Sequence, residues 1–323
     1  KILGKDVSIE QEMVLQNIAK TAMTGKVAEN SRDKLSKIIV EAVRAVQVHI
    51  EDIKVERVIG KSAEESELVK GVVLDKERVH PEMPVMLENA RVALLNCAIE
   101  IRNTEIDAKI QITNPSQLNQ FLDQEERSLR EIVDRVVASG ANVLLCQKGI
   151  DDLAQHFLAK AGIMAARRVS KSDLEKLARA TNAKIVTNWK ELSSSDLGQA
   201  GMVRQSKVGE EEMIFVEKCP SPKAVTLLVK GGTEHVADEV KRAVTDALGD
   251  LKAALESGKI VAGAGAIEME VVKRLREYSR GLSGKEQLAV LAYADSLEIV
   301  PRTLAENAGL DPIEVLTQLR AAH

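Results

Sequence analysis

The sequence predicts a multi-domain protein that joins an α/β region to all-α regions. Three observations support this fold class. At 323 residues the chain is long enough for two or three domains. In its middle part, short apolar runs alternate with helical patterns, as in a layered α/β domain. Near both ends, apolar residues instead recur at helical spacing, which is typical of amphipathic helices.

Composition narrows the possible partners. Hydrophobic residues make up 45% and charged residues 29% of the chain, an ordinary mixture for a soluble globular protein. A net charge of −4 gives no electrostatic reason to expect nucleic acid or an anionic membrane, and 2% aromatic residues are too few for base-stacking surfaces. No apolar run approaches the ~20 residues that cross a bilayer. Because the three cysteines are scattered and no segment resembles a signal peptide, we expect an intracellular, cytoplasmic protein.

The first part of the chain predicts two helices and a strand. The helices fall within residues 8–47 and are separated by the turn Thr24-Gly25-Lys26. This turn invites comparison with a phosphate-binding loop, but the full P-loop spacing is absent. From the residues alone, Lys26 is therefore expected to be an exposed lysine between helices. Residues 48–58 alternate between apolar and polar, as a half-buried strand does.

The middle of the chain, about residues 70–223, predicts the α/β layers. Ala90–Ile99 and Gly140–Gln147 are short apolar runs, typical of strands that are buried on both faces. Between them lies an insert, about residues 108–137, that contains a long charged helix. The helix carries more apolar residues than an isolated charged helix needs, and taken alone these favour ordinary packing: Leu118, Phe121, Leu122, Leu129, Ile132 and Val133. Helices are also predicted at 150–162 and 170–183, and strands at 183–187 and 213–217.

Residues 231–265 predict a long amphipathic helix between two glycine-rich turns. Thr233 can cap its start, and Gly258 suits the left-handed conformation at a helix end. At about 100° per residue, Asp246 falls off the apolar stripe and onto the polar face. By pattern alone it is a solvated acidic residue. Two further helices are predicted at 267–276 and 285–299, and another is expected to start at Asp311-Pro312.

The residues alone do not predict a catalytic centre. The five histidines show no metal-ligand spacing, so no metal site is expected in this chain. A Ser–His–Asp set is recognised by geometry and cannot be argued from spacing. Without further information, the sequence supports only a soluble multi-domain α/β protein, and a metabolic α/β enzyme lacks any supporting motif.

Five blocks, in order along the chain, resemble the group II chaperonins of the archaeal thermosome type. They are TAMTGK (Thr21–Lys26), ESELVKGVVLDKERVHPEMP (Glu65–Pro84), CQKGIDDLAQHFLAKAGIMAARRV (Cys146–Val169), the segment from GGTEHVADEV to AGAGA (Gly231–Ala266) and TLAENAGLD (Thr303–Asp311). Together they cover almost the whole chain.

The resemblance implies a nested domain order. Residues 1–8 and 257–323 would be parts of the equatorial domain, 9–69 and 224–256 the two segments of the intermediate domain, and 70–223 the apical domain. The insert at about 108–137 would be the helical protrusion, a built-in lid over the ring cavity. The apical domain would be inserted into the intermediate domain, and that domain into the equatorial one. The two intermediate segments are therefore expected to meet in space.

The resemblance also implies a function, its cofactors and its partners. It implies an ATP-dependent protein-folding subunit of a double ring, with ATP and magnesium as cofactors and with unfolded polypeptides and other subunits as partners. Asp246 would be the catalytic carboxylate that arrives when the domains close, and Thr24, Gly25 and Lys26 would approach the γ-phosphate. Gly263, Ala264 and Gly265 would lie near the sugar and base of the nucleotide. Ala264 stands where many members of the family have glycine.

Two further expectations concern the lid and the missing parts of the pocket. In an open ring, Leu118, Phe121, Leu122, Leu129, Ile132 and Val133 would be exposed as an interaction surface. The phosphate loop GDGTT of the family is absent, and both ends of the chain are expected to be cut. The chain shown is thus expected to be inactive alone as an ATPase. The alternative function is an ATP-independent holdase of the apical type.

Overall fold

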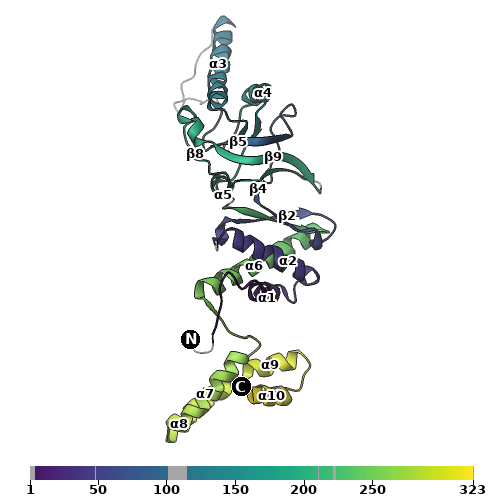
Figure 1. The fold of residues 1–323 in the computed structure, drawn as a ribbon, viewed down its shortest axis with the longest axis vertical. Coiled ribbons are helices and arrows are strands. Elements are labelled where there is room, and N and C mark those ends of the chain that lie inside the picture. The colour runs from purple at the N-terminus through teal and green to yellow at the C-terminus, as the bar shows by residue number, and fades with distance from the viewer. Residues whose placement is uncertain (1–3, 48, 101–114, 210, 221–222, 323) are drawn as a thin grey trace. The chain divides into compact units, whose positions relative to one another are not determined.

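The computed structural model describes residues 4–47, 49–100, 115–209, 211–220 and 223–322 (Figure 1). The chain divides into two compact units. The large unit is residues 9–253, and the small unit is residues 1–8 together with 254–323. The small unit contains the two segments that were expected to be equatorial. The division into equatorial, intermediate and apical domains stays a prediction.

A seven-stranded mixed sheet forms the centre of the large unit. Its β5, β6 and β7 are parallel, β8 also pairs in parallel with β5, and β9, β10 and β4 continue the sheet with antiparallel pairs. Two of the strands expected from apolar runs, β5 and β6, are found here. In spatial order the strands are β4 (Gly71–Leu74), β10 (Glu211–Glu217), β9 (Gly198–Val208), β5 (Met86–Leu95), β6 (Val143–Cys146) and β7 (Met164–Ala166), with β8 (Ile185–Val186) beside β5.

Helices cover both faces of this sheet. On one face, α3 (Pro115–Ser139) and α4 (Asp152–Lys160) pack against Ala93 and Leu95 of β5. On the other face, α5 (Lys171–Thr181) packs in the same cluster as Val92 and Leu94. The alternation follows from the strand geometry, in which successive side chains point to opposite faces. Figure 1 shows the resulting three layers, and the expected α/β architecture is confirmed.

A smaller sheet of three strands joins distant segments of the large unit. Its central strand is β11 (Val225–Gly231), which is parallel to β2 (Ile53–Ile59) and antiparallel to β3 (Glu67–Val69). The two segments expected to form one domain therefore do meet in space. The strand predicted from residue 48 begins only at Ile53, because residues 50–52 form a single turn of 3₁₀ helix. The helices α1 (Glu12–Met23), α2 (Arg32–Ala45) and α6 (Glu234–Ser257) complete this part (Figure 1).

The two sheets are joined through a buried threonine of β11. The hydroxyl of Thr226 donates to the carbonyl oxygen of Gly71 at 3.1 Å and accepts from the amide of Val73, also at 3.1 Å. Both partners belong to β4, which is the edge strand of the seven-stranded sheet. Since Thr226 is fully buried, no water replaces these bonds. A single side chain thus satisfies two backbone groups of a sheet edge.

Replacing Thr226 with valine is expected to lower the free energy of unfolding by about 2–3 kcal/mol, because it leaves a buried N–H and a buried C=O without a partner. The isosteric side chain keeps the packing. The control is Thr226→Ser, which keeps the hydroxyl and loses one methyl group, for about 1 kcal/mol. Denaturant titration followed by the fluorescence of Trp189, the single tryptophan, measures both. A valine variant no less stable than the serine variant would contradict the proposed link.

Over its described residues, 4–8 and 254–322, the small unit is helical apart from one short strand pair. There β1 (Lys5–Asp6) pairs with β12 (Lys259–Ile260), and four helices follow: α7 (Ala266–Ser279), α8 (Gly284–Leu297), α9 (Ile299–Asn307) and α10 (Pro312–Ala322). A largely buried carboxylate, that of Glu298, binds Arg276 at 2.9 Å and Arg320 at 2.7 Å. The expected combination of α/β and all-α regions is confirmed. None of the helices described is both long and apolar enough to span a membrane.

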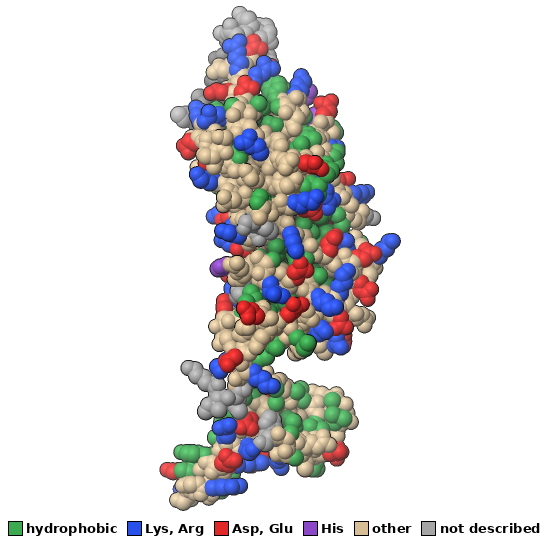
Figure 2. All heavy atoms as spheres, viewed as in Figure 1, with side chains coloured by type: hydrophobic (Ala, Val, Ile, Leu, Met, Phe, Trp, Pro, Cys, Tyr) green, Lys and Arg blue, Asp and Glu red, His purple; other side chains and the backbone are tan. Residues whose placement is uncertain are grey.

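Large apolar side chains lie on the surface of the small unit (Figure 2). They come from its loops and from α7 to α10, and surface of this kind is typical of contact with another segment or subunit. The exposed residues are Val261, Tyr278, Leu288, Tyr293, Ile299, Val300, Leu304, Leu310 and Ile313.

Candidate functional site

The turn after α1 positions Lys26. The helix ends at Met23, and the amide of Lys26 donates back to the carbonyl oxygen of Met23 at 3.3 Å. Between them, Gly25 has φ of 73°, in the left-handed region that glycine adopts without strain. The hydroxyl of Thr24 donates to the carbonyl oxygen of Lys20 at 2.9 Å, which holds that side chain against the last turn of α1. Lys26 therefore projects from a fixed helix end.

Asp246 lies on the outer face of α6. The neighbouring residues Ala243, Val244 and Ala247 are fully buried, and this fixes the rotation of the helix about its axis. The side chain of Asp246 is 48% exposed. The predicted position of Asp246, on the polar face beside the apolar stripe, is found in the structure.

Lys26 and Asp246 form an ion pair. The ammonium Nζ donates to the carboxylate Oδ2 at 2.5 Å, although the two residues are 220 positions apart in the sequence. The lysine side chain is 38% exposed, so water has access to both partners. Ion pairs this exposed contribute only about 0–1 kcal/mol. The pair can therefore exchange one partner for another at little cost in stability.

A second ion pair lies one turn further back on α1. Lys20 contacts Asp33 of α2 at 2.6 Å. The hydrogen bond from Lys20, together with the positive charge of that lysine, lowers the pKa of the Asp33 carboxyl. Beside Lys26, the amide of Gly25 donates to a carboxylate oxygen of Glu29 at 3.2 Å. The end of α1 thus presents two lysines, each already opposite a carboxylate.

This arrangement suits the binding of an anion and the orientation of water. A lysine ammonium is a compact charge that binds phosphate oxygens, and a nearby carboxylate can accept a proton from a water molecule. Nucleophilic chemistry at the buried thiols is disfavoured. Burial raises the pKa of Cys146 to about 12 and that of Cys219 to about 11, so both stay protonated near neutral pH.

The glycine-rich turn expected near the sugar and base belongs to the small unit. Ala264 has φ of 57° and Gly265 has φ of 82°, and Gly265 is the N-cap of α7. A Cβ atom on Gly265 would lie 2.7 Å from Cβ of Pro301, so the glycine is required for packing as well. Gly263 and Ala264 are exposed. That this turn and Lys26 bind the same nucleotide stays a prediction.

The expected lid residues divide into two groups. The side chains of Leu118, Phe121 and Leu122 lie outside the described residues. For three others, further along α3, the packing expected from the residues alone is confirmed: Leu129, Ile132 and Val133 are 1%, 6% and 3% exposed and pack with α4 and the sheet. Their exposure in an open ring stays a prediction. In this conformation they are core residues, because this end of α3 rests on the face of the sheet. A role for α3 in a lid stays a prediction.

Sequence reasoning missed the polar contacts between the sheets. Lys54 of β2 lies 2.9 Å from Asp173 at the start of α5, and its Nζ donates to the carbonyl oxygen of Val73 at 2.8 Å. Arg179 of α5 binds Asp52 in a second link. These pairs join residues far apart in sequence, and an alternating strand pattern gives no signal that Lys54 is half-buried.

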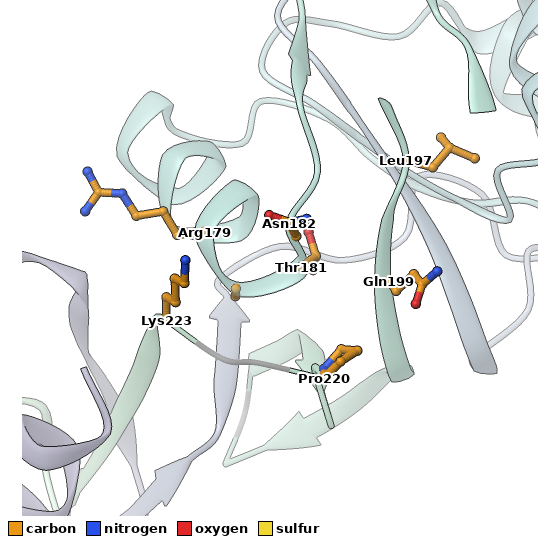
Figure 3. A pocket seen from close by; sticks show the side chains of 8 residues that line it. Arg179, Thr181, Asn182, Leu197, Gln199, Pro220 and Lys223 are labelled. Atoms are coloured by element: carbon orange, nitrogen blue, oxygen red, sulfur yellow. The ribbon is translucent and has the colours of Figure 1, made fainter. Parts of the chain in front are cut away.

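A hollow of about 420 Å³ lies at the end of α5 (Figure 3). Arg179 and Lys223 bring two positive charges to one side of it, and Thr181, Asn182 and Gln199 add polar groups. None of the residues lining it belongs to the expected nucleotide site. The candidate site therefore rests on the pair of Lys26 and Asp246.

Comparisons with known proteins agree across the whole chain. A model of the TCP-1/cpn60 chaperonin family matches residues 1–323. The chain is 57% identical to a thermosome subunit of Methanopyrus kandleri, across 99% of this chain and 60% of that protein. It is 56% identical to a thermosome subunit of Methanocaldococcus jannaschii, across 100% of this chain and 61% of that protein.

A solved structure also resembles this one. It is an open-state monomer of a group II chaperonin from Methanococcoides burtonii, with a TM-score of 0.72 and 42% sequence identity. The match covers 100% of this chain and 76% of that one. The chain thus spans about 60% of the length of the thermosome subunits it matches.

Proposed function

Because the chain belongs to the TCP-1/cpn60 chaperonin family, we propose that it acts within an ATP-hydrolysing subunit that folds proteins inside a double ring. The resemblance to archaeal thermosome subunits is confirmed by the relatives. The proposal concerns a whole subunit, because the chain spans about 60% of the length of the thermosome subunits it matches. Its partners would be further subunits and unfolded polypeptides in the cytoplasm, and α3 would belong to the lid.

The observation that carries the proposal is the contact between Lys26 and Asp246. We assign the ammonium of Lys26 to the γ-phosphate of ATP, and the carboxylate of Asp246 to the attacking water. Lys26 projects from the turn after α1 and Asp246 from α6, and both side chains remain open to solvent. Mg²⁺ would neutralise charge on the phosphates when ATP is bound, and no residue of this chain is assigned to it.

The pair also suggests how nucleotide and catalysis are coupled. A phosphate oxygen competes with Asp246 for the same ammonium group. Since the exposed ion pair is weak, ATP can draw Lys26 away without destabilising the fold. The released carboxylate is then able to accept a hydrogen bond from water. Closure of the domains would bring it to the γ-phosphate, so hydrolysis would follow closure.

Replacing Lys26 with methionine is expected to weaken ATP binding by about 10–100-fold, because a hydrogen bond to a charged group contributes about 1.5–3 kcal/mol. Methionine keeps most of the side-chain length without the charge. The measurement is the Kd for ATP and the rate of hydrolysis by assembled rings.

The matched control is Lys20→Met, because Lys20 lies on the same helix and also pairs with a carboxylate. If both variants bind ATP equally well, Lys26 has no special role at the phosphate. If the rings hold unfolded polypeptide equally with and without ATP, and hydrolyse none, the holdase alternative is favoured.

A further inference from the structure

Two histidines and a glutamate from distant segments meet on the large unit. His80 and Glu82 lie in the link between β4 and β5, and His156 lies on α4. A ring nitrogen of each histidine and a carboxylate oxygen of Glu82 all lie within 4.8 Å of one another. The two rings are edge to face, with centroids 5.8 Å apart. Spacing along the sequence gave no sign of this cluster, because the fold and not a local motif assembles it.

The link that carries His80 and Glu82 is held in place. The amide of Val79 donates to the carbonyl oxygen of Ala165 in β7 at 2.9 Å. The amide of Met83 donates to the carbonyl oxygen of His80 at 3.1 Å. The guanidinium of Arg78 donates to the carbonyl oxygen of Met83 at 2.5 Å. Met83 itself is 2% exposed, in the core beside α4. The backbone that presents His80 and Glu82 is therefore fixed on both sides.

The helix that carries His156 is equally well anchored. Asp151 caps its N-terminus by accepting from the amide of Leu153 at 2.9 Å. The neighbouring Gln155 is buried, and its amide donates to the carbonyl oxygen of Ile150 at 2.7 Å. On the other side, the ring of Phe157 lies under the guanidinium of Arg130, 5.0 Å from the ring centroid. The side chain of His156 therefore projects from a well-anchored turn of α4.

We propose that His80, Glu82 and His156 bind a divalent transition-metal ion of the Zn²⁺ class. Two imidazoles and one carboxylate form a ligand set that zinc accepts, with a fourth position left for water or an outside ligand. Metal–nitrogen distances of about 2.0–2.1 Å require ligand atoms about 3.4 Å apart, so the side chains must close in. Glu82 is exposed and can rotate inward, and both histidines are half-buried.

One existing hydrogen bond is given up on binding. Nδ1 of His80 accepts from the amide of Glu82 at 3.2 Å. A metal bound at Nδ1 takes the place of that amide. A metal bound at Nε2 leaves the ring proton on Nδ1, which then can no longer accept the hydrogen bond. Because Glu82 lies at the surface, water can satisfy its freed amide. Bound metal would then fasten the link after β4 to α4, two elements that lie on the same face of the sheet.

The test is a titration of the intact chain with Co²⁺, whose visible absorption reports its ligands, followed by competition with Zn²⁺. We expect saturable binding of one Co²⁺ per chain, displaced by Zn²⁺. Glu82→Gln and His156→Gln are each expected to weaken binding by more than about tenfold, as loss of even an outer partner of a metal site does. A thiolate-to-cobalt absorption band would overturn the assignment, because it would place the metal on a cysteine.

The matched control is His235→Gln, at an exposed histidine of α6 outside the cluster. It should leave the affinity unchanged. Glu82→Gln changes a surface side chain and keeps the fold, so its result is interpretable even if a histidine variant folds poorly. Binding that is equal in the wild type, Glu82→Gln and His235→Gln would refute the proposed site.

Discussion

Replacing Asp246 with alanine is expected to reduce ATP turnover by about 10²–10⁴-fold, while ring assembly and ATP binding persist. The size of the effect is that of removing a positioned general base. Assembly should survive because Asp246 is exposed, and its ion pair with Lys26 contributes little to stability. The measurement is steady-state hydrolysis by rings of the subunit encoded in full, with size and ATP affinity checked for each variant.

A matched control lies one turn further along the same helix. Asp250 is exposed on the same polar face of α6, so Asp250→Ala removes an equal charge from the same helix face without touching the contact with Lys26. It should leave turnover within about twofold of the wild type, since screening limits the effect of a remote charge. If Asp246→Ala also hydrolyses ATP at the normal rate, Asp246 is a solvated helix residue and the proposed mechanism must be withdrawn.

Local sequence patterns predicted much of the fold, because the burial and helix capping seen in the structure are also what determine those patterns. Residues 92–95 of β5 and all of β6 are buried on both faces, and stretches of strand buried in this way must be apolar. Asp151 and Ser170 cap α4 and α5 where the sequence suggested helices. Gly258 has φ of 66°, which only a residue such as glycine adopts easily at a helix end.

Local sequence patterns could not predict which strands pair in the sheets. The longest strand, β9 (Gly198–Val208), was not predicted, because it contains two glycines and its inner positions are filled by small residues such as Ala200. Its pairing with β5 and β10 is set by the whole sheet. At Ile132 the packing expected from the residues alone is found, but an apolar helix residue has the same sequence signal whether it is always buried or becomes exposed in an open ring.

The candidate site was predictable only through resemblance. Lys26 and Asp246 lie on polar faces, where charged residues are normal, and 220 positions separate them. Nothing in their local patterns indicates that they meet. The cluster at His156 gave no signal for the same reason, since His156 lies far along the sequence from His80 and Glu82. A site assembled from distant segments can be identified only from the folded structure, which brings those segments together.

Replacing Gly71 with alanine is expected to destabilise the large unit by about 3 kcal/mol or more. A Cβ atom at this position would lie 1.9 Å from the carbonyl oxygen of Val216, and 3.2 Å from Cα of Glu217. Both belong to the backbone of β10, so no side-chain rotation relieves the clash. The edge strand β4 would have to move away, and the bond from Thr226 to Gly71 would be lost with it.

Gly249→Ala, in the same unit, is expected to change stability in the opposite direction. Gly249 lies inside α6, and a Cβ atom there meets nothing within 4 Å. Alanine should stabilise the helix by about 0.5–1 kcal/mol, because glycine loses more backbone entropy on folding. Denaturant titrations followed by Trp189 fluorescence should therefore shift in opposite directions for the two variants. If Gly71→Ala unfolds like the wild type, β4 and β10 have room to adjust, and the close contact does not fix this edge of the sheet.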